Sequence, residues 1–398
     1  MIAFRPSLRH ILLVIVGICV VAVIATLICL VAIPRTSESV VKNTTLNEAI
    51  APDPALEYGN FKILLAGTTF WGRNTNKMAR ASDLGIKYPF SGLHTLGRDA
   101  YDAWIAGLEC PITENGHTDY NENTLLKFNC DPDYLSEAAK WFTALSLGNN
   151  HVDNWGAEGF ATTKQNLSSS GIQYFGHYDY KNTTEICAPV IVPARLIYDD
   201  GTERDINFPV GFCGIHGVFG VPSESALQEI KLFSAILPTI VMPHMGAEYK
   251  PSADAIRSNL YRKLIDYGAE MVIGDHPHWI QNTEAYKSRL IVYSMGNFMF
   301  DQLWSSEVVR SAAISANAKL DPDVDFDIWD ALAADCLIDR INCLENIKTA
   351  DLKKPLITWD FAFLGTTSAA TRITRLANPA EQAAIGERLN WSATLKDL

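Results

Sequence analysis

Short apolar runs alternate with helix-like segments between about residues 61 and 302. The runs are apolar nearly throughout: FKILLAG (61–67), WIAGLE (104–109), FTALSLG (142–148), GIQYFG (171–176), LPTIVMPH (237–244), EMVIGD (270–275) and RLIVYSMG (289–296). Helical spacing of apolar residues predicts helices between several of them, at 133–141, 157–170 and 252–267. Strands of this type are buried on both faces, so the pattern predicts an α/β fold with helices covering its sheet.

Two stretches depart from this alternation. The segment ARLIYDDGTERDINFPVGFCGIHG (194–217) has the pattern of a hairpin that turns at Asp200-Gly201, which makes part of the sheet antiparallel. Residues 303–352 show no clear period, and we expect them to be a loop or an elaboration at the rim of the sheet.

The N-terminus contains an uncharged apolar segment, residues 11–33, preceded by Arg5 and Arg9. A helix of roughly 20 apolar residues spans a bilayer, and basic residues favour the cytoplasmic side. We therefore predict a cytoplasmic N-terminus (1–10), a transmembrane anchor (11–33), a linker (34–58) and an extracytoplasmic domain (59–398), at the cell surface or in the periplasm. A cleaved signal peptide is the alternative.

Charge and cysteine content narrow the classes of function. The formal net charge of −12 and the isoelectric point near 5.2 argue against a nucleic-acid partner, because such partners are bound mainly by Lys and Arg. Six of the eight cysteines lie outside the apolar segment, and an exported domain permits disulfides. We expect Cys336 and Cys343 to form a local bridge, with buried free thiols as the alternative.

Polar residues of metal-ligand type follow many of the predicted strands. They are Glu109, Asn150, His151, His244, His276 and His278. Ligands of open α/β sheets bind at the carboxyl ends of the strands, where such residues would meet. Each could instead be a turn former, a cap or a buried histidine. Their joint placement favours one site for a divalent ion, and the mixture of oxygen and imidazole donors suits zinc, manganese or iron better than calcium.

Four blocks carry a family resemblance. They are LLAGTTFWGR (64–73), AGLECPITENG (106–116), the segment 145–176 that contains GNNHVDNWG, and the segment 242–302 that contains GDHPH and GNFMFD. In order and spacing the chain resembles the CapA family of poly-γ-glutamate capsule biosynthesis proteins, which is similar to the calcineurin-like metallophosphoesterases. The resemblance implies a metallophosphatase-like two-sheet sandwich covered by helices (αββα), with a dinuclear metal centre at the strand ends.

The resemblance also implies roles for individual residues. Glu109 matches an acid that bridges two metals, and Asn150 matches a ligand of one of them. His244 and His276 would complete that ion's shell, whereas His278 would serve the other ion. His151 matches a histidine that orients substrate or protonates a leaving group, and it is the predicted catalytic residue.

One motif departs from the family pattern, because Thr68 stands where the family carries an aspartate. A neutral hydroxyl is a poor ligand for a hard dication, so we expect one firmly held ion and a weak or empty second position. Asp275 could replace the missing carboxylate. We expect it instead to be a turn residue, since its side chain should alternate away from His276 and His278.

The substrate-binding predictions are Arg73, placed to clamp an anion, together with Asn149 and Asn297. Two functions remain open. The chain is either a metal-dependent hydrolase or transferase acting on a phosphoester or a cell-surface polymer bond, or a non-catalytic component that binds polymer within a membrane-bound capsule synthesis complex. The Asn150–His151 pair favours the first function, and Thr68 favours the second.

Overall fold

The computed structural model describes residues 54–114, 126–182, 184–340, 342–369 and 371–398. The predicted cytoplasmic segment, the anchor and nearly all of the linker lie outside these residues. Within the described ranges, no helix combines the length and apolar character needed to cross a membrane. Residues 54–398 form one compact unit, and its first strand begins at Leu56.

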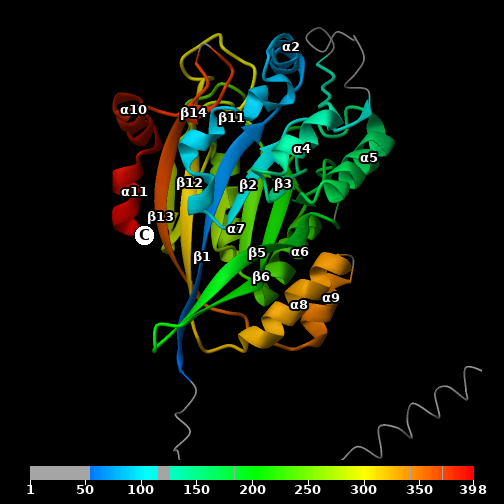
Figure 1. Ribbon diagram of the computed structural model, residues 1–398. Coiled ribbons are helices and arrows are strands. Elements are labelled where there is room, and N and C mark those ends of the chain that lie inside the picture. The colour runs from blue at the N-terminus through cyan, green and yellow to red at the C-terminus, as the bar shows by residue number, and fades with distance from the viewer. Residues whose placement is uncertain (1–53, 115–125, 183, 341, 370) are drawn as a thin grey trace, which may run out of the picture. The chain divides into compact units, whose positions relative to one another are not determined.

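Fourteen strands of the described chain join in one mixed sheet (Figure 1). They are β1 (Leu56–Thr69), β2 (Ala103–Leu108), β3 (Ala144–Ser146), β4 (Gln173–Phe175), β5 (Cys187–Tyr198), β6 (Glu203–His216), β7 (Thr239–His244), β8 (Met271–Ile273), β9 (Thr283–Tyr286), β10 (Arg289–Val292), β11 (Asn297–Met299), β12 (Arg310–Leu320), β13 (Ile357–Thr367) and β14 (Arg375–Leu376). Each of the seven apolar runs overlaps a strand, and β5 and β6 form the predicted antiparallel hairpin.

Helices cover this sheet, which confirms the α/β class. They are α2 (Arg73–Ala81), α4 (Leu135–Ala138), α5 (Gly156–Ser169), α6 (Glu224–Ile236), α7 (Ala255–Asp266), α8 (Phe326–Ile338), α9 (Cys343–Thr349), α10 (Pro379–Leu389) and α11 (Trp391–Asp397). Short 3-10 helices lie at Gly85–Phe90, Leu93–Leu96, Arg98–Ala100 and Pro132–Tyr134. Figure 1 shows α10 and α11 on one flank of the sheet and α5 on the other. Of the three predicted helices, 157–170 and 252–267 match α5 and α7, while 133–141 is only a 3-10 turn followed by α4.

The long strand β1 divides the sheet into two branches. Its first residues pair with β5, whereas residues from Ile63 onward pair with β2. The two faces of β1 enter different cores: Ile63 and Leu65 pack in one apolar cluster, and Leu64 and Ala66 pack in the other. The strands are therefore hydrogen-bonded through β1 rather than split into two separate sheets.

The segment 303–352 contains regular structure, so of its two predicted alternatives, a loop or an elaboration at the rim, the loop was wrong. Strand β12 lies antiparallel to β1 near the middle of the sheet, and α8 follows it. The sequence of β12, RSAAISANAKL, is built from small residues, of which most are buried. Alanine and serine carry a weak hydrophobic signal, so their burial depends on the neighbouring strands rather than on local pattern.

All six cysteines outside the apolar segment are paired, in the bridges Cys110–Cys130, Cys187–Cys213 and Cys336–Cys343. The predicted bridge between Cys336 and Cys343 is confirmed. The other two join positions 20 and 26 residues apart, which sequence could not select among the alternatives.

These bridges give a stability prediction. Cross-linking restricts the unfolded chain more when the loop is longer, and the Cys187–Cys213 loop spans 26 residues against 7 for Cys336–Cys343. We expect double alanine replacement to lower the free energy of unfolding by about 3 kcal/mol for the longer loop and about 2 kcal/mol for the shorter one. Urea unfolding of the full chain measures both values. A larger loss for the Cys336–Cys343 variant would contradict the loop-length argument.

Candidate metal centre

The carboxyl ends of parallel strands bring the predicted residues together. Glu109 follows β2, and Asn149, Asn150 and His151 follow β3, while His244 ends β7 and residues 275–278 follow β8. Strands β1, β2 and β3 are parallel to one another, as are β6, β7 and β8. The two groups meet where Asn150 Oδ1 lies 2.8 Å from His244 Nε2. The predicted rim of polar residues is thus a single buried cluster.

A trio of these side chains can offer ligand atoms to one ion. Glu109, His276 and His278 are buried, and one ligand atom from each lies within 4.8 Å of the others. His244 Nε2 adjoins this trio, at 3.5 Å from Glu109 Oε2 and 3.1 Å from His276 Nδ1. Carboxylate, amide oxygen and imidazole nitrogen atoms therefore lie close together, and this donor set fits a divalent transition metal. The assignment of His276 and His278 to different ions stays a prediction.

Burial sets the charge state of the cluster. It raises the pKa of Glu109 to about 8, although the hydrogen bond from Asn149 opposes this shift. Burial also raises the pKa of Asp275 to about 7 and holds the pKa values of His244 and His276 well below their usual range. The low-dielectric surroundings thus favour neutral forms of all four groups. A bound dication would instead favour the ionised carboxylates.

The turn after β8 has an unusual backbone. His276 and His278 adopt φ values of +89° and +57°, in the left-handed region that non-glycine residues seldom occupy. The chain between them is therefore not extended, and the expected alternation of side chains fails. Strain of this kind costs on the order of 1–3 kcal/mol per residue and is typical of functional sites.

Asp275 shows the consequence of this turn. Its carboxylate points into the cluster, with Oδ1 2.7 Å from His244 Nδ1 and Oδ2 accepting a hydrogen bond of 3.2 Å from the Thr68 hydroxyl. The prediction that this side chain would face away was wrong. Thr68, expected to be a degenerate ligand position, donates its hydroxyl to this carboxylate.

His151 lies at the edge of the cluster. Its backbone N–H donates to Asn149 Oδ1 at 2.7 Å, and its Nδ1 lies 3.0 Å from Asn154 Oδ1. The ring stacks on Phe128 with centroids 3.9 Å apart, and burial lowers the pKa of His151 to about 4. Sequence reasoning did not single out Asn154, although it stands within the block GNNHVDNWG.

His278 is positioned from the opposite side. Its Nδ1 lies 2.7 Å from Asn297 Oδ1, and the ring stacks on Tyr249 at 5.7 Å. The amide nitrogen of Asn297 donates to Gln302 Oε1 and to the Val308 carbonyl. Asn297 therefore contacts a predicted ligand, and its role in substrate binding stays a prediction.

Arg73 is buried and paired rather than open to solvent. Its guanidinium contacts Asp301 through Nε and Nη2, and it lies 4.3 Å from the centroid of the Phe128 ring. This ion pair borders a cavity of about 440 Å³ that Trp304 and Arg372 also line. Asp301 escaped sequence reasoning, although it ends the block GNFMFD.

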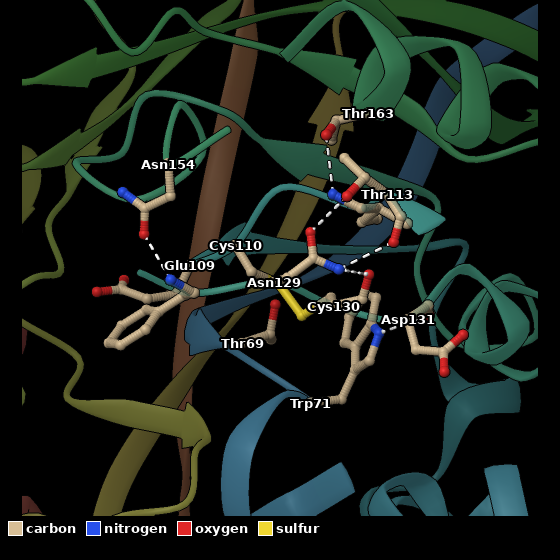
Figure 2. The surroundings of a disulfide bond; sticks show 12 residues. Thr69, Trp71, Glu109, Cys110, Thr113, Asn129, Cys130, Asp131, Asn154 and Thr163 are labelled. Atoms are coloured by element: carbon tan, nitrogen blue, oxygen red, sulfur yellow. Dashed lines mark hydrogen bonds between the residues drawn. A yellow bond between two sulfur atoms is a disulfide. The ribbon is translucent and has the colours of Figure 1, made fainter. Parts of the chain in front are cut away.

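A disulfide anchors the backbone beside Glu109. Figure 2 shows the Cys110–Cys130 bridge with the Glu109 carboxylate directed away from the sulfur atoms. The amide of Asn129 donates to the carbonyls of Thr113 and Cys130, so the strand end and the returning segment are tied by both covalent and hydrogen bonds (Figure 2). This rigid support holds a carboxylate in the interior, where an isolated charge is costly.

The fold and site define an α/β protein with a buried carboxylate and imidazole cluster of metal-binding type. The model of the family described as "Bacterial capsule synthesis protein PGA_cap" matches residues 62–197 and 224–302, and the chain belongs to this family. It is 25% identical over 294 residues to the "Capsule biosynthesis protein CapA" of Bacillus anthracis, covering 72% of this chain and 69% of that protein. It is 30% identical to the "PGA biosynthesis protein CapA" of Bacillus subtilis, over 41% of this chain and 44% of that protein.

Solved structures are more distant. A Staphylococcus aureus chain provisionally named a 5'-nucleotidase, crystallised with alpha-ketoglutarate, gives a TM-score of 0.37 at 13% identity, over 66% of this chain and 51% of that chain. The protein TT1561 of Thermus thermophilus gives a TM-score of 0.29 at 10% identity, over 63% of this chain and 92% of that chain.

Proposed function

We propose that the chain is a membrane-anchored capsule biosynthesis protein of the poly-γ-glutamate type, with a metal-dependent hydrolase-like site in its extracytoplasmic domain. The observation that carries this proposal is the buried trio Glu109, His276 and His278, whose ligand atoms lie within 4.8 Å of one another. His244 and Asn150 adjoin the trio. Membership of a capsule synthesis family supports a place at the cell surface.

The ion would be manganese, zinc or iron, with one held firmly. When bound, such an ion polarises a phosphoryl or carbonyl oxygen and lowers the pKa of a bound water. The residues around it exclude bulk water, since all of the trio is buried. The substrate in this proposal is a phosphoester or a bond of an anionic cell-surface polymer, and Arg73, Asn149 and Asn297 are its predicted contacts.

His151 has a defined protonation state in this proposal. Asn154 Oδ1 accepts a hydrogen bond from the Phe128 N–H at 2.7 Å, so the atom that faces His151 Nδ1 is an acceptor. Nδ1 therefore carries the proton, and with the pKa of His151 lowered to about 4 its Nε2 is unprotonated near neutral pH. This state makes His151 a proton acceptor, so the role of general acid implied by the resemblance would require a prior proton transfer.

The test separates catalysis from binding. The full chain is purified, its bound metal is quantified by mass spectrometry, and hydrolysis of p-nitrophenyl phosphate, bis-p-nitrophenyl phosphate and poly-γ-glutamate is measured. We expect His151→Ala to retain the metal but to lose about 10²- to 10⁴-fold in rate, which is the usual share of acid–base catalysis.

A matched control is His94→Ala, since His94 is exposed and lies outside the cluster, with its Nδ1 2.8 Å from the Ser91 carbonyl oxygen. Metal without activity on any of the three substrates would favour the alternative, a non-catalytic polymer-binding component of a capsule complex. Absence of metal from the wild-type chain would overturn the hydrolase-like site.

A further inference from the structure

Asp275 is a buried carboxylate that the resemblance gives no role. Its side chain is 6% exposed. One oxygen faces His244 Nδ1 at 2.7 Å, and the other accepts a hydrogen bond from Thr68 at 3.2 Å. A Cβ atom on Gly107 would lie 2.3 Å from Asp275 Oδ2, so the neighbouring strand end leaves the room that this carboxylate occupies. Asp275 therefore has a specific place between β1, β2 and β7.

The amide of Asn149 defines the other side of the His244 ring. Its Oδ1 accepts the His151 N–H at 2.7 Å, which fixes the orientation of the amide. Its Nδ2 then faces Glu109 Oε2 at 2.7 Å and lies against the His244 ring, 3.0 Å from Nε2 and 3.3 Å from Nδ1. Because it is near both ring nitrogens, this amide does not select the one that carries the ring proton.

The Asp275 carboxylate selects one tautomer. An ionised carboxylate only accepts, so His244 Nδ1 carries the ring proton and donates it to Asp275 Oδ1 at 2.7 Å, which leaves Nε2 of the neutral imidazole unprotonated. The lone pair of Nε2 is then directed toward the side of the ring where Asn150 Oδ1 and Glu109 Oε2 lie, at 2.8 Å and 3.5 Å. A histidine that ligates a metal commonly donates its other ring N–H to a carboxylate in this way.

We infer that Asp275, held by the Thr68 hydroxyl, is a positioning residue that fixes the Nδ1–H tautomer and the orientation of His244 and so directs Nε2 toward the proposed ion. The direction of Nε2 toward an ion rests on the proposed function, whereas the tautomer of His244 follows from contacts among protein atoms alone. Thr68 accordingly acts as the donor that orients the carboxylate. Asp275 contacts the side of the His244 ring that faces away from the proposed ion. The resemblance implies a carboxylate at position 68 instead, in direct contact with the ion.

The first test reads the tautomer without any metal. Two-bond ¹H–¹⁵N correlation spectra of the full chain, labelled with ¹⁵N-histidine and treated with EDTA at pH 8.5, distinguish protonated from unprotonated ring nitrogens. The spectrum of His244→Gln identifies the signals. We expect His244 to show a protonated Nδ1 and an unprotonated Nε2 in the wild type, and a mixture of tautomers in Asp275→Asn. A protonated Nε2 in the wild type would overturn the inference.

The second test reads metal affinity by calorimetric titration with Mn²⁺ and Zn²⁺. We expect Asp275→Asn to weaken binding about 10- to 100-fold, the usual cost of losing an outer partner of a ligand. Thr68→Val should weaken it less, and Thr68→Ser, which keeps the hydroxyl, should bind as the wild type does. The control Asp131→Asn changes a buried carboxylate that contacts Arg80, outside the cluster, and should leave both readouts unchanged.

The outcomes separate the two proposals. If the wild type binds metal and Asp275→Asn binds it equally well, Asp275 has no positioning role even though the metal centre stands. If the wild type shows the Nδ1–H tautomer but binds neither ion, the hydrogen-bond assignment stands and the proposed metal function fails. Should Asp275→Asn not fold, Thr68→Val and Thr68→Ser still decide, since equal affinity in both would overturn the inference.

Discussion

His276→Ala is expected to lower the affinity for Mn²⁺ or Zn²⁺ by at least about 100-fold, because even an outer partner of a metal ligand is worth 10- to 100-fold. His276 belongs to the trio with Glu109 and His278, and its Nδ1 lies 3.1 Å from His244 Nε2. Its removal takes away one of the three ligand atoms that the trio offers to the ion. Isothermal titration of the full chain measures the effect.

The strained backbone of His276 supplies a matched variant. Since its φ is +89°, His276→Gly removes the same ligand while allowing the backbone to relax, and it should be about 1 kcal/mol more stable than His276→Ala. Equal loss of affinity in both variants, despite their different stabilities, would show that the ligand and not the fold is responsible. Affinity within threefold of the wild type in either variant would remove His276 from the proposed centre.

The metal-free chain is expected to lose stability as pH rises from 6.5 to 8.5, and bound metal is expected to cancel that loss. The folded-state pKa values of Glu109 and Asp275, about 8 and about 7, lie above the ordinary values of 4.5 and 3.8. A raised pKa means that the native state holds protons which the unfolded state has released, so the associated stability declines as pH rises through the folded pKa. The decline from Glu109 alone is on the order of 2 kcal/mol across this window.

The buried histidines act in the opposite direction and in a different window. The pKa values of His244 and His276 lie well below 6.5, and that of His151 is about 4. The folding stability that these neutral histidines contribute is therefore present above pH 6.5 and is lost as pH falls. The metal-free chain should therefore be most stable near pH 6.5. Above that pH only the carboxylates contribute to the slope.

Urea unfolding at pH 6.5, 7.5 and 8.5, with EDTA and with Mn²⁺, measures both effects. Glu109→Gln should flatten the alkaline slope without metal, because the amide does not titrate. A slope that is the same with and without Mn²⁺ would mean that the ion does not contact these carboxylates. Glu137→Gln, which changes a partly buried acid paired with Lys140 outside the cluster, serves as the control and should keep the wild-type slope.

Local pattern predicted those strands that are apolar along their whole length. β7 and β8 are examples, since both are buried at every residue and follow clear apolar runs. Strand β12 was not predicted, because its alanines and serines become buried only through pairing with β1 and β13. The disulfides show the same limit: Cys336 and Cys343 are near in sequence, but Cys187 and Cys213 meet only because β5 and β6 pair in register.

The sequence by itself determined the residue types of the site. Glutamate, asparagine and histidine follow the ends of predicted strands, which places them on one rim of the sheet. Tertiary structure alone decided which atoms meet. It grouped Glu109 with His276 and His278, and it turned Asp275 inward to His244. The physical reason is that ligand identity is a property of residue type and strand position, whereas the left-handed turn at His276 and the space beside Gly107 come from packing between distant strands.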